Sequence, residues 1–169
     1  LQAAEDSMLP DFIARYEKDE RSGVKTLVEK ARKRIQKLET EYARIENLKK
    51  YEKEYADAGY ICGIDEVGRG PLAGPVVAGA VILPKDCDKL YDEIMEKAVA
   101  TGIGMAGPGR IDEINILQAT YEAMRQAITN LKVKPDILLN DAVTIPGVDI
   151  RQVPIIKGDA KSISIGAAS

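Results

Sequence analysis

The stretch Tyr60–Leu83, YICGIDEVGRGPLAGPVVAGAVIL, contains two apolar runs separated by a glycine-rich loop. This arrangement predicts a buried strand, a loop and a second buried strand. The first run nevertheless ends in two adjacent carboxylates, Asp65 and Glu66, and the tripeptide Gly-Arg-Gly follows almost at once. A strand that serves only the core has no need of two acids at its end, so the stretch indicates a site as well as a fold.

The rest of the chain from residue 84 onward alternates between helical and extended patterns. Ile111–Leu131 has helical spacing of its apolar residues, and "KLYDEIMEKAVA", Lys89–Ala100, fits a helix. The start of a further helix is expected in Ala160–Ser169. The predicted strands are Tyr60–Asp65, Gly74–Leu83, Thr101–Ala106, Asp136–Ala142 and Val153–Asp159. Strands first and alternating helices and strands afterwards predict an α/β domain with a mixed sheet.

The N-terminal third has a different composition. From about Asp11 to Tyr55 it contains one glycine and no proline, and its apolar residues recur every three or four positions, as in an amphipathic helix. We therefore predict a helical extension at residues 1–57 and a second domain at residues 58–169. Lys25–Lys37 is strongly basic. It is either a solvated helix face or a surface that meets phosphates, and the sequence leaves both open.

The composition excludes several kinds of site. The chain has no histidine, so Ser-His-Asp triads, Cys-His pairs and histidine zinc sites are excluded. Acid–base or metal chemistry must then use Asp, Glu, Lys, Tyr or water. Carboxylate oxygens suit hard cations such as Mg²⁺ or Mn²⁺.

Composition also bears on location. No apolar run approaches the ~20 residues of a membrane span, and the N-terminus lacks the pattern of a signal peptide. Cys62 and Cys87 are not at metal-ligand spacing, and Cys62 is expected to be a small core residue. We expect a monomer in the reducing cytoplasm, without a membrane partner.

Acids stand at three predicted strand ends. Asp65 and Glu66 end the first strand, Asp141 the fourth, and the fifth runs into Asp159. Open α/β sheets place their ligands at the carboxyl ends of strands. A divalent cation would remove the penalty of grouping these acids, and two cations about 3.5–4 Å apart would form a clamp for phosphoryl chemistry. The adjacent pair Asp112-Glu113 is expected instead to favour the first turn of a helix.

Two loops beside these acids carry glycine and a cation. One is Gly68-Arg69-Gly70, and the other is "KGDAKS", which begins at Lys157. Neither is a dinucleotide fingerprint or a phosphate-binding P-loop. Glycine permits close approach of a ligand to the backbone and arginine pairs with phosphate, so together the loops could hold a nucleic-acid backbone.

At these residues the sequence resembles a known family. "GIDEVGRGPLAGPVVAGAVIL", "IDEINIL", "DILLNDA" and "IIKGDAKSISI" are similar to the signature blocks of bacterial ribonuclease HII, the type 2 ribonuclease H. The N-terminal "DFIARYEKDERSGVKTLVEKA" resembles the helical extension of some Gram-positive members. The resemblance implies a ribonuclease H-like mixed five-stranded sheet flanked by helices, with an N-terminal helical extension.

The resemblance also implies an activity. It is endonucleolytic hydrolysis 5′ to a ribonucleotide, in RNA–DNA hybrids or in duplex DNA that contains ribonucleotides, as in ribonucleotide excision repair. Two-metal-ion catalysis with Mg²⁺ or Mn²⁺ would give 3′-hydroxyl and 5′-phosphate ends. By resemblance, the metal-binding and catalytic carboxylates are Asp65, Glu66, Asp141 and Asp159. Gly68, Arg69, Gly70 and Lys157 would bind the substrate.

The sequence also departs from the family pattern. Asp88 runs straight into "KLYDEI" where the family has an Asp-Ser-Lys-Lys-Leu loop, and Gly166 replaces a family alanine. The chain also ends before the C-terminal portion, which supplies a tyrosine that stacks on the sugar. One alternative is therefore a catalytically incomplete, nucleic-acid-binding fragment of the same fold. Another makes Val24–Tyr55 a coiled-coil interaction module supported by the remaining residues.

Overall fold

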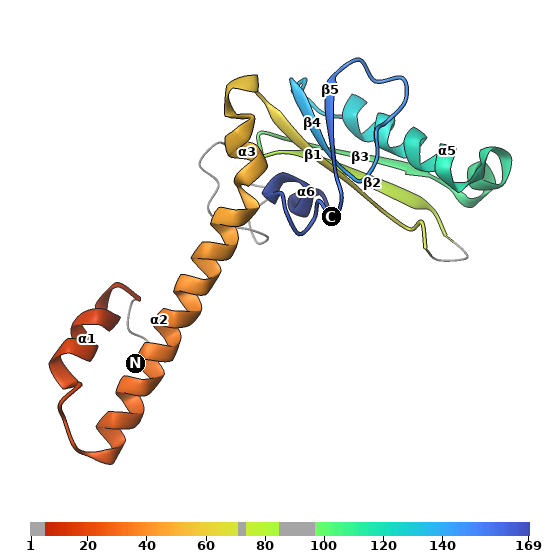
Figure 1. Ribbon diagram of the computed structural model, residues 1–169. Helices are drawn as coiled ribbons and strands as arrows, with labels where there is room; N and C mark the ends of the chain where they lie inside the picture. Colours follow the sequence, from red (N-terminus) through yellow and green to blue (C-terminus); the bar gives the residue numbers. More distant parts are fainter. Residues whose placement is uncertain (1–5, 71–73, 85–96) are drawn as a thin grey trace. The chain divides into compact units, whose positions relative to one another are not determined.

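The computed structural model describes residues 6–70, 74–84 and 97–169 (Figure 1). The chain divides into two compact units, Leu1–Glu46 and Asn47–Ser169. The domain boundary predicted between residues 57 and 58 stays a prediction. No helix in the described part of the chain is long and apolar enough to cross a membrane.

The N-terminal third is helical, as predicted. The elements are a 3₁₀ turn at Asp6–Met8, α1 at Leu9–Tyr16, α2 at Ser22–Leu48, α3 at Lys50–Glu54 and a second 3₁₀ turn at Ala56–Ala58. The single long helix expected from the spacing is thus interrupted at Lys49, between α2 and α3.

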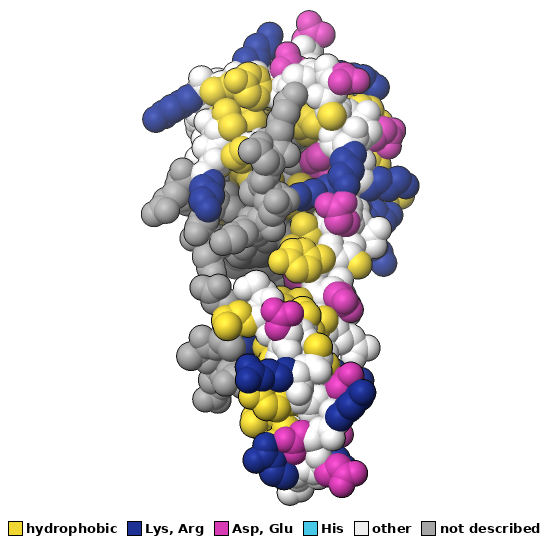
Figure 2. All heavy atoms as spheres, turned by 90° about the vertical axis from the view of Figure 1, so that its left-hand side faces the viewer, with side chains coloured by type: hydrophobic (Ala, Val, Ile, Leu, Met, Phe, Trp, Pro, Cys, Tyr) yellow, Lys and Arg dark blue, Asp and Glu magenta, His cyan; other side chains and the backbone are white. Residues whose placement is uncertain are grey.

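The first unit has a small core of its own. Leu9 of α1 and Val28 and Ala31 of α2 are buried. The basic stretch Lys25–Lys37 also contributes ion pairs within this unit: Arg34 Nη2 lies 2.6 Å from Asp6 Oδ1, and Arg32 Nη2 lies 3.5 Å from Glu17 Oε2. Figure 2 shows basic and acidic side chains interspersed on one face of this unit rather than a continuous basic surface.

The second unit contains the predicted mixed sheet. Its strands are β1 (Ile61–Val67), β2 (Val76–Ile82), β3 (Ala100–Ala106), β4 (Ile137–Asp141) and β5 (Arg151–Ile155). They lie in the order β3-β2-β1-β4-β5. The β1–β2 and β2–β3 pairs are antiparallel, and the β1–β4 and β4–β5 pairs are parallel. The carboxyl ends of β1, β4 and β5 therefore meet at one edge.

Two helices cover opposite faces of this sheet (Figure 1). α5 (Pro108–Thr129) lies so close to β3 that a Cβ on Gly104 would meet the carbonyl of Ala123. α6 (Ile163–Ala168) lies so close to β1 that a Cβ on Gly63 would meet the backbone of Ser164. Glycine is needed at both positions because the helix backbones approach the strands directly.

Three sequence predictions are corrected here. The helix predicted at Lys89–Ala100 falls mostly on residues 85–96, outside the described residues, but Ala100 is already the first residue of β3 and pairs with Ile82. β1 continues to Val67, so the first strand does not end at Asp65. β5 ends at Ile155, so Asp159 lies beyond the strand. Cys87 also lies outside the described residues.

The helix predicted at Ile111–Leu131 is present as α5, with a break. Asn115 has φ +67° and ψ 163°, and its Oδ1 accepts a hydrogen bond from the Gln118 N–H at 3.1 Å, so the side chain caps the longer second part. The first turn of α5 contains no acid, and the role expected for Asp112 and Glu113 there is wrong. Glu113 instead pairs with Arg110 at 2.9 Å.

Candidate active site at the carboxyl ends of the parallel strands

Asp65 and Asp141 lie on neighbouring parallel strands. Ile64 of β1 pairs with Asn140 of β4, so the next residue on each strand is one of these acids. Asp65 shares a sheet face with Gly63, because side chains two positions apart point the same way, and α6 covers that face. The register therefore brings together two of the four predicted carboxylates.

Asp65 is buried, with 7% of its surface exposed. Loss of solvent raises its pKa above the ordinary value, and the nearby negative charges of Asp141 and Glu66 raise it further. Hydrogen bonds from the Glu66 N–H, at 2.7 Å from Asp65 Oδ1, and from Ser169 act in the opposite direction on this pKa. Burial and like charge thus make ionised Asp65 unfavourable unless a cation compensates.

Glu66 has one satisfied and one unsatisfied carboxylate oxygen. Its Oε1 accepts a hydrogen bond from Arg69 Nη1 at 2.9 Å. Its Oε2 is buried and has no hydrogen-bond partner among the residues that the structure describes. The Glu66 side chain is 13% exposed. Such an oxygen carries a desolvation cost that a bound cation would offset.

Asp141 anchors the turn that follows β5. Its Oδ1 accepts a hydrogen bond from the Gly158 N–H at 2.7 Å. A Cβ on Gly158 would lie 3.1 Å from the Ile155 carbonyl oxygen and 3.3 Å from Asp141 Oδ1. The turn backbone therefore approaches the Asp141 carboxylate closely, and this favours glycine at position 158.

Asp159 and Lys157 lie in this turn, and both are exposed. Lys157 has φ +58°, a left-handed conformation that is uncommon for a residue with a side chain. Asp159 is one residue beyond the Gly158 anchor. The structure thus connects Asp159 to Asp141 through the turn backbone and leaves the Asp159 side chain at the surface.

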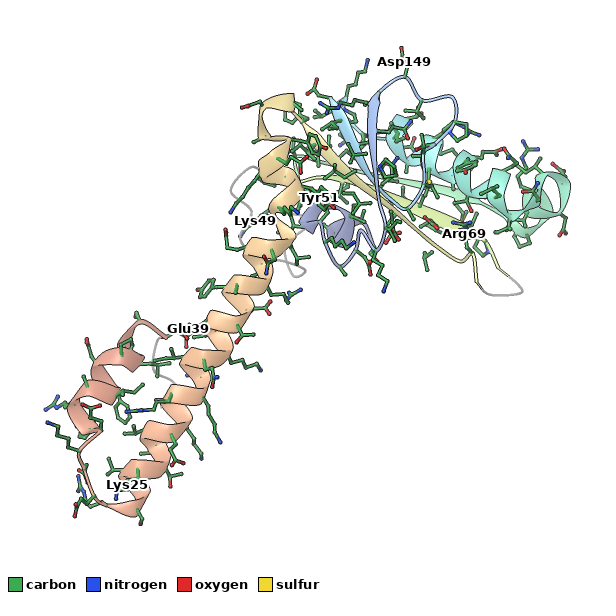
Figure 3. All side chains as sticks on the ribbon, in the orientation of Figure 1. Lys25, Glu39, Lys49, Tyr51, Arg69 and Asp149 are labelled. Atoms are coloured by element: carbon green, nitrogen blue, oxygen red, sulfur yellow. The ribbon has the colours of Figure 1, made fainter. Side chains whose placement is uncertain are left out.

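The Gly-Arg-Gly loop leaves the end of β1 beside Glu66. Gly68 has φ +97°, and a Cβ there would meet the carbonyl of Pro75, so glycine is required. Among the described residues, a Cβ on Gly70 would meet nothing within 4 Å. The Arg69 side chain is 39% exposed, and Figure 3 shows it at the end of β1, at the start of the loop. An exposed guanidinium is thus available beside the buried acids.

The donor set suits a hard cation, but the side chains are not yet arranged around one. In residues 6–70, 74–84 and 97–169, no three His, Cys, Asp or Glu side chains are grouped so as to hold a metal ion. Asp65, Glu66 and Asp141 nevertheless supply only oxygen ligands, and Glu66 Oε2 is unpaired. These residues fit Mg²⁺ or Mn²⁺ chemically, with Glu66 at present engaged by Arg69.

Two residues that the sequence analysis did not select contribute to this region. Ser169, at the end of α6, lies close enough to Asp65 to lower the pKa of that carboxyl. Glu52 of α3 contacts the N-terminus of α6, where its Oε1 accepts from Ser162 Oγ at 2.5 Å. The serines of "AKSISIGAAS" were a visible helix-start signal for Ser162. Nothing in the sequence around Glu52 distinguishes it from the other acids of the extension.

Comparison with known proteins identifies the relatives of this chain. Residues 1–56 match the model of the ribonuclease HII N-terminal domain. Ribonuclease HII of Lachnoclostridium phytofermentans is 63% identical, over 92% of this chain and 67% of that protein. Ribonuclease HII of Clostridioides difficile is 46% identical, over 100% of this chain and 73% of that protein.

The chain belongs to the ribonuclease HII family. This confirms the resemblance inferred from the signature blocks, and with it a type 2 ribonuclease H, a hydrolase that cuts as an endoribonuclease. Among solved structures, ribonuclease H2 from Pyrococcus horikoshii aligns with a TM-score of 0.54 at 22% identity, over 64% of this chain and 68% of that one. That likeness confirms the ribonuclease H-like fold predicted for the sheet and its helices.

Proposed function

We propose that this ribonuclease HII hydrolyses the phosphodiester on the 5′ side of a ribonucleotide, in RNA–DNA hybrids and in duplex DNA containing ribonucleotides. The products would carry 3′-hydroxyl and 5′-phosphate ends. The observation that supports this most is the position of buried Asp65 and of Asp141, each one residue beyond the Ile64–Asn140 pair of β1 and β4.

The proposed metal ligands are Asp65, Glu66, Asp141 and Asp159. Bound Mg²⁺ or Mn²⁺ supplies activation of water and stabilisation of charge on the scissile phosphate. The chain contributes position: Asp65 is fixed by β1 and hydrogen-bonded from the Glu66 N–H, and Asp141 is fixed by β4 and the Gly158 N–H. Asp159 is the most exposed of the four, on a turn that Asp141 anchors.

Selection of a ribonucleotide is proposed for the Gly-Arg-Gly loop. A protein distinguishes RNA from DNA through the 2′-hydroxyl. The positive φ of Gly68 and the open space around Gly70 allow backbone groups to approach a sugar. Arg69 can exchange its ion pair with Glu66 for a phosphate, which would also free Glu66 for metal. Lys157 would contact the phosphate from the opposite turn.

This activity fits a role in ribonucleotide excision repair in the cytoplasm, with nucleic acid as the partner of a monomeric enzyme.

Cleavage of a DNA duplex that contains one ribonucleotide tests the proposal directly. We expect cleavage 5′ to the ribonucleotide with Mg²⁺ or Mn²⁺, and end-group analysis should find 3′-hydroxyl and 5′-phosphate. Asp65→Asn should reduce the rate at least about 10³-fold, since it removes a charge that compensates the metal. Binding of the duplex without cleavage by the wild-type chain would favour the alternative of a nucleic-acid-binding fragment.

A second arm of this experiment tests the basic stretch. The variant in which Lys25, Lys30, Lys33 and Lys37 become Gln should bind the duplex with a smaller salt dependence if these residues contact phosphates. An unchanged salt dependence would identify Lys25–Lys37 as a solvated helix face. Loss of self-association in this variant, with unchanged cleavage, would favour the interaction-module alternative.

A further inference from the structure

The helix α3 (Lys50–Glu54) packs on the catalytic sheet. Tyr51 and Tyr55 contact the cluster formed by Leu139 of β4, Ile155 of β5 and Ile165 of α6. The guanidinium of Arg151 lies 5.0 Å from the ring centre of Tyr55. Figure 3 shows Tyr51 at the point where α3 passes α6. The segment around α3 is the last part of the region that matches the N-terminal family model, and it therefore packs against the sheet.

Between the two tyrosines, Glu52 contacts the start of α6. Its Oε1 accepts from the hydroxyl of Ser162 at 2.5 Å and from the N–H of Ser164 at 3.0 Å. The Ser162 hydroxyl in turn accepts from the Ile165 N–H at 3.2 Å. Glu52 Oε2 is buried, and within the described part of the chain it has no hydrogen-bond partner. A carboxylate held in this way pays a desolvation cost that an ordinary surface acid avoids.

Ser162 is also the last residue of the turn that carries Lys157 and Asp159. Within the turn, the N–H groups of Lys161 and Ser162 donate to the Gly158 carbonyl at 2.9 and 2.8 Å. Near the start of the turn, the Gly158 N–H donates a hydrogen bond to Asp141. At the end of the turn, the Ser162 hydroxyl donates a hydrogen bond to Glu52. The turn is thus fixed by two carboxylates, one from the sheet and one from the N-terminal region.

The backbone of this turn needs such anchors. Lys157 is left-handed at φ +58°, a conformation that is unfavourable for a residue with a side chain and persists where the surroundings enforce it. The Asp159 carbonyl lies only 3.1 Å from the position of a Cβ on Gly166, so the turn also rests on α6. Loss of the hydrogen bond between Glu52 and Ser162 would therefore leave the end of the turn at Ser162 less well held, while the bond from Gly158 to Asp141 remains.

We propose that Glu52 is a positioning residue of the active site, which holds the Lys157–Ser162 turn, and with it Asp159 and Lys157, in place for metal and substrate. The proposal rests on the function proposed above for Asp159 and Lys157. Glu52 acts through Ser162 and Ser164 and does not touch substrate. The N-terminal region of this ribonuclease HII thereby contributes to the geometry of the catalytic turn.

The test uses the full chain, four single variants, the double variant of Glu52→Ala with Ser162→Ala, and Asp159→Asn. Glu52→Ala removes both hydrogen bonds, and Glu52→Gln keeps an acceptor of the same shape. Ser162→Ala removes the hydroxyl that Glu52 binds. Asp57→Asn is the matched control, because Asp57 is an exposed acid five positions along the same region. Hydrogen exchange of the metal-free proteins and steady-state cleavage are measured for each.

For Glu52→Ala we expect amides of Lys157–Ile165 to exchange about 10-fold faster or more, since a lost hydrogen bond to a charged group is worth a factor of about 10 or more. Exchange of the amides of β1 and β4 should be unchanged.

The kcat of Glu52→Ala should fall about 10-fold or more, with KM changed less than about 3-fold. Glu52→Gln should restore most of both losses, and Asp57→Asn should match wild type. Ser162→Ala should reproduce Glu52→Ala, and the double variant should be no worse than either single one.

Unchanged exchange in the turn of Glu52→Ala would overturn the proposal, as would a rate loss that Glu52→Gln fails to relieve. If Glu52→Ala does not fold, Glu52→Asp takes its place, because it shortens the side chain by one methylene and leaves the Ser162 cap on the Ile165 N–H intact. If the turn loosens in Glu52→Ala while Asp159→Asn cleaves at the wild-type rate, the anchor is real and the role proposed for Asp159 fails. Hydrogen exchange thus tests Glu52 even if the proposed function is wrong.

Discussion

In the metal-free protein, burial and neighbouring negative charges both disfavour the ionised form of Asp65. Its position in β1 buries it, and its neighbours Asp141 and Glu66 bear the same charge, so its pKa is raised, chiefly by loss of solvent. A residue selected for stability alone would be neutral here. A carboxylate kept under these conditions is characteristic of a functional site.

Asp65→Asn is therefore expected to stabilise the metal-free protein. Because the folded-state pKa lies above that of the unfolded chain, the folded protein binds the extra proton, and stability falls as pH rises from about 3.8 through the raised pKa. Asn at position 65 does not ionise, so the variant does not lose stability in this way as pH rises. Its Tm should exceed that of wild type near neutral pH, by about 2–4 °C for each kcal/mol of added stability. The difference should shrink as pH falls toward the ordinary Asp value.

Thermal unfolding with a chelator, followed over about pH 4–8, measures this difference. Asp57→Asn, at an exposed acid, is the control for charge removal. A variant that is less stable than wild type throughout this range would show that burial of Asp65 is already compensated.

Cys62 illustrates the opposite case of a polarisable residue that serves only the core. It is fully buried, and burial raises the pKa of its thiol to about 12. The thiolate is the reactive form, so we expect no alkylation of Cys62 in the folded protein at neutral pH and rapid alkylation in denaturant. Peptide masses after labelling distinguish it from Cys87. Labelling of folded Cys62 at the rate found in denaturant would contradict its burial.

At the scale of elements, close approach of helices to strands fixes the site. α6 meets β1 and β2 at Gly63 and Gly79, where a Cβ would collide with the backbone of Ser164 and the carbonyl of Ala168. This approach places the end of α6, with Ser169, against Asp65. Glycines in strands are costly in isolation, but here they permit the contact that completes the site.

Gly63→Ala should destabilise the protein by at least about 2 kcal/mol, because the added methyl meets backbone that cannot rotate away. The measurement is the denaturant midpoint at constant m-value. Gly109→Ala is the control: it lies in α5 with nothing within 4 Å of its Cβ position, so it should be neutral or stabilising by up to about 1 kcal/mol. Equal effects of the two variants would refute the close approach of α6.

At the scale of the whole molecule, the contacts join α3 to the sheet. The second compact unit begins at Asn47, and Tyr51 and Tyr55 belong to the cluster around Ile155 and Ile165. The family model for the N-terminal domain ends later, at residue 56. The family-model boundary at residue 56 therefore separates Tyr51 and Tyr55 from the residues of the sheet unit against which they pack.

Two deletions should behave differently for this reason. Removal of residues 1–46 should leave cooperative unfolding of the remaining unit with a Tm close to that of its transition in the full chain. Removal of residues 1–57 also deletes Glu52 and the contacts of two partly buried tyrosines, Tyr51 and Tyr55, and should lower that Tm by roughly 5 °C or more. Calorimetry of the two proteins measures this. Equal Tm values would show that α3 contributes nothing to the sheet.

The sequence by itself was enough for the main architecture and for the candidate acids. Period and composition predicted a strand at or near each of the five observed strands, most closely where the strand is a short apolar run, as in β2 and β4; β5, which begins with Arg151 and Gln152, was predicted two residues too late. Asp65 and Asp141 could be expected side by side because parallel strands share their carboxyl edge. The match of the signature blocks to ribonuclease HII then followed from the same residues.

Only the tertiary structure decided the details that depend on distant partners. Glu52 meets Ser162 across 110 positions of sequence, and no local pattern marks that pair. The place of Asp159 in a turn, beyond β5, depends on the left-handed Lys157 and on the Gly158 bond to Asp141. Local patterns reflect the propensity and burial of neighbouring residues, whereas these contacts arise only when separate segments close on one another. The sequence thus determined which acids form the candidate site, and the tertiary structure determined what holds them.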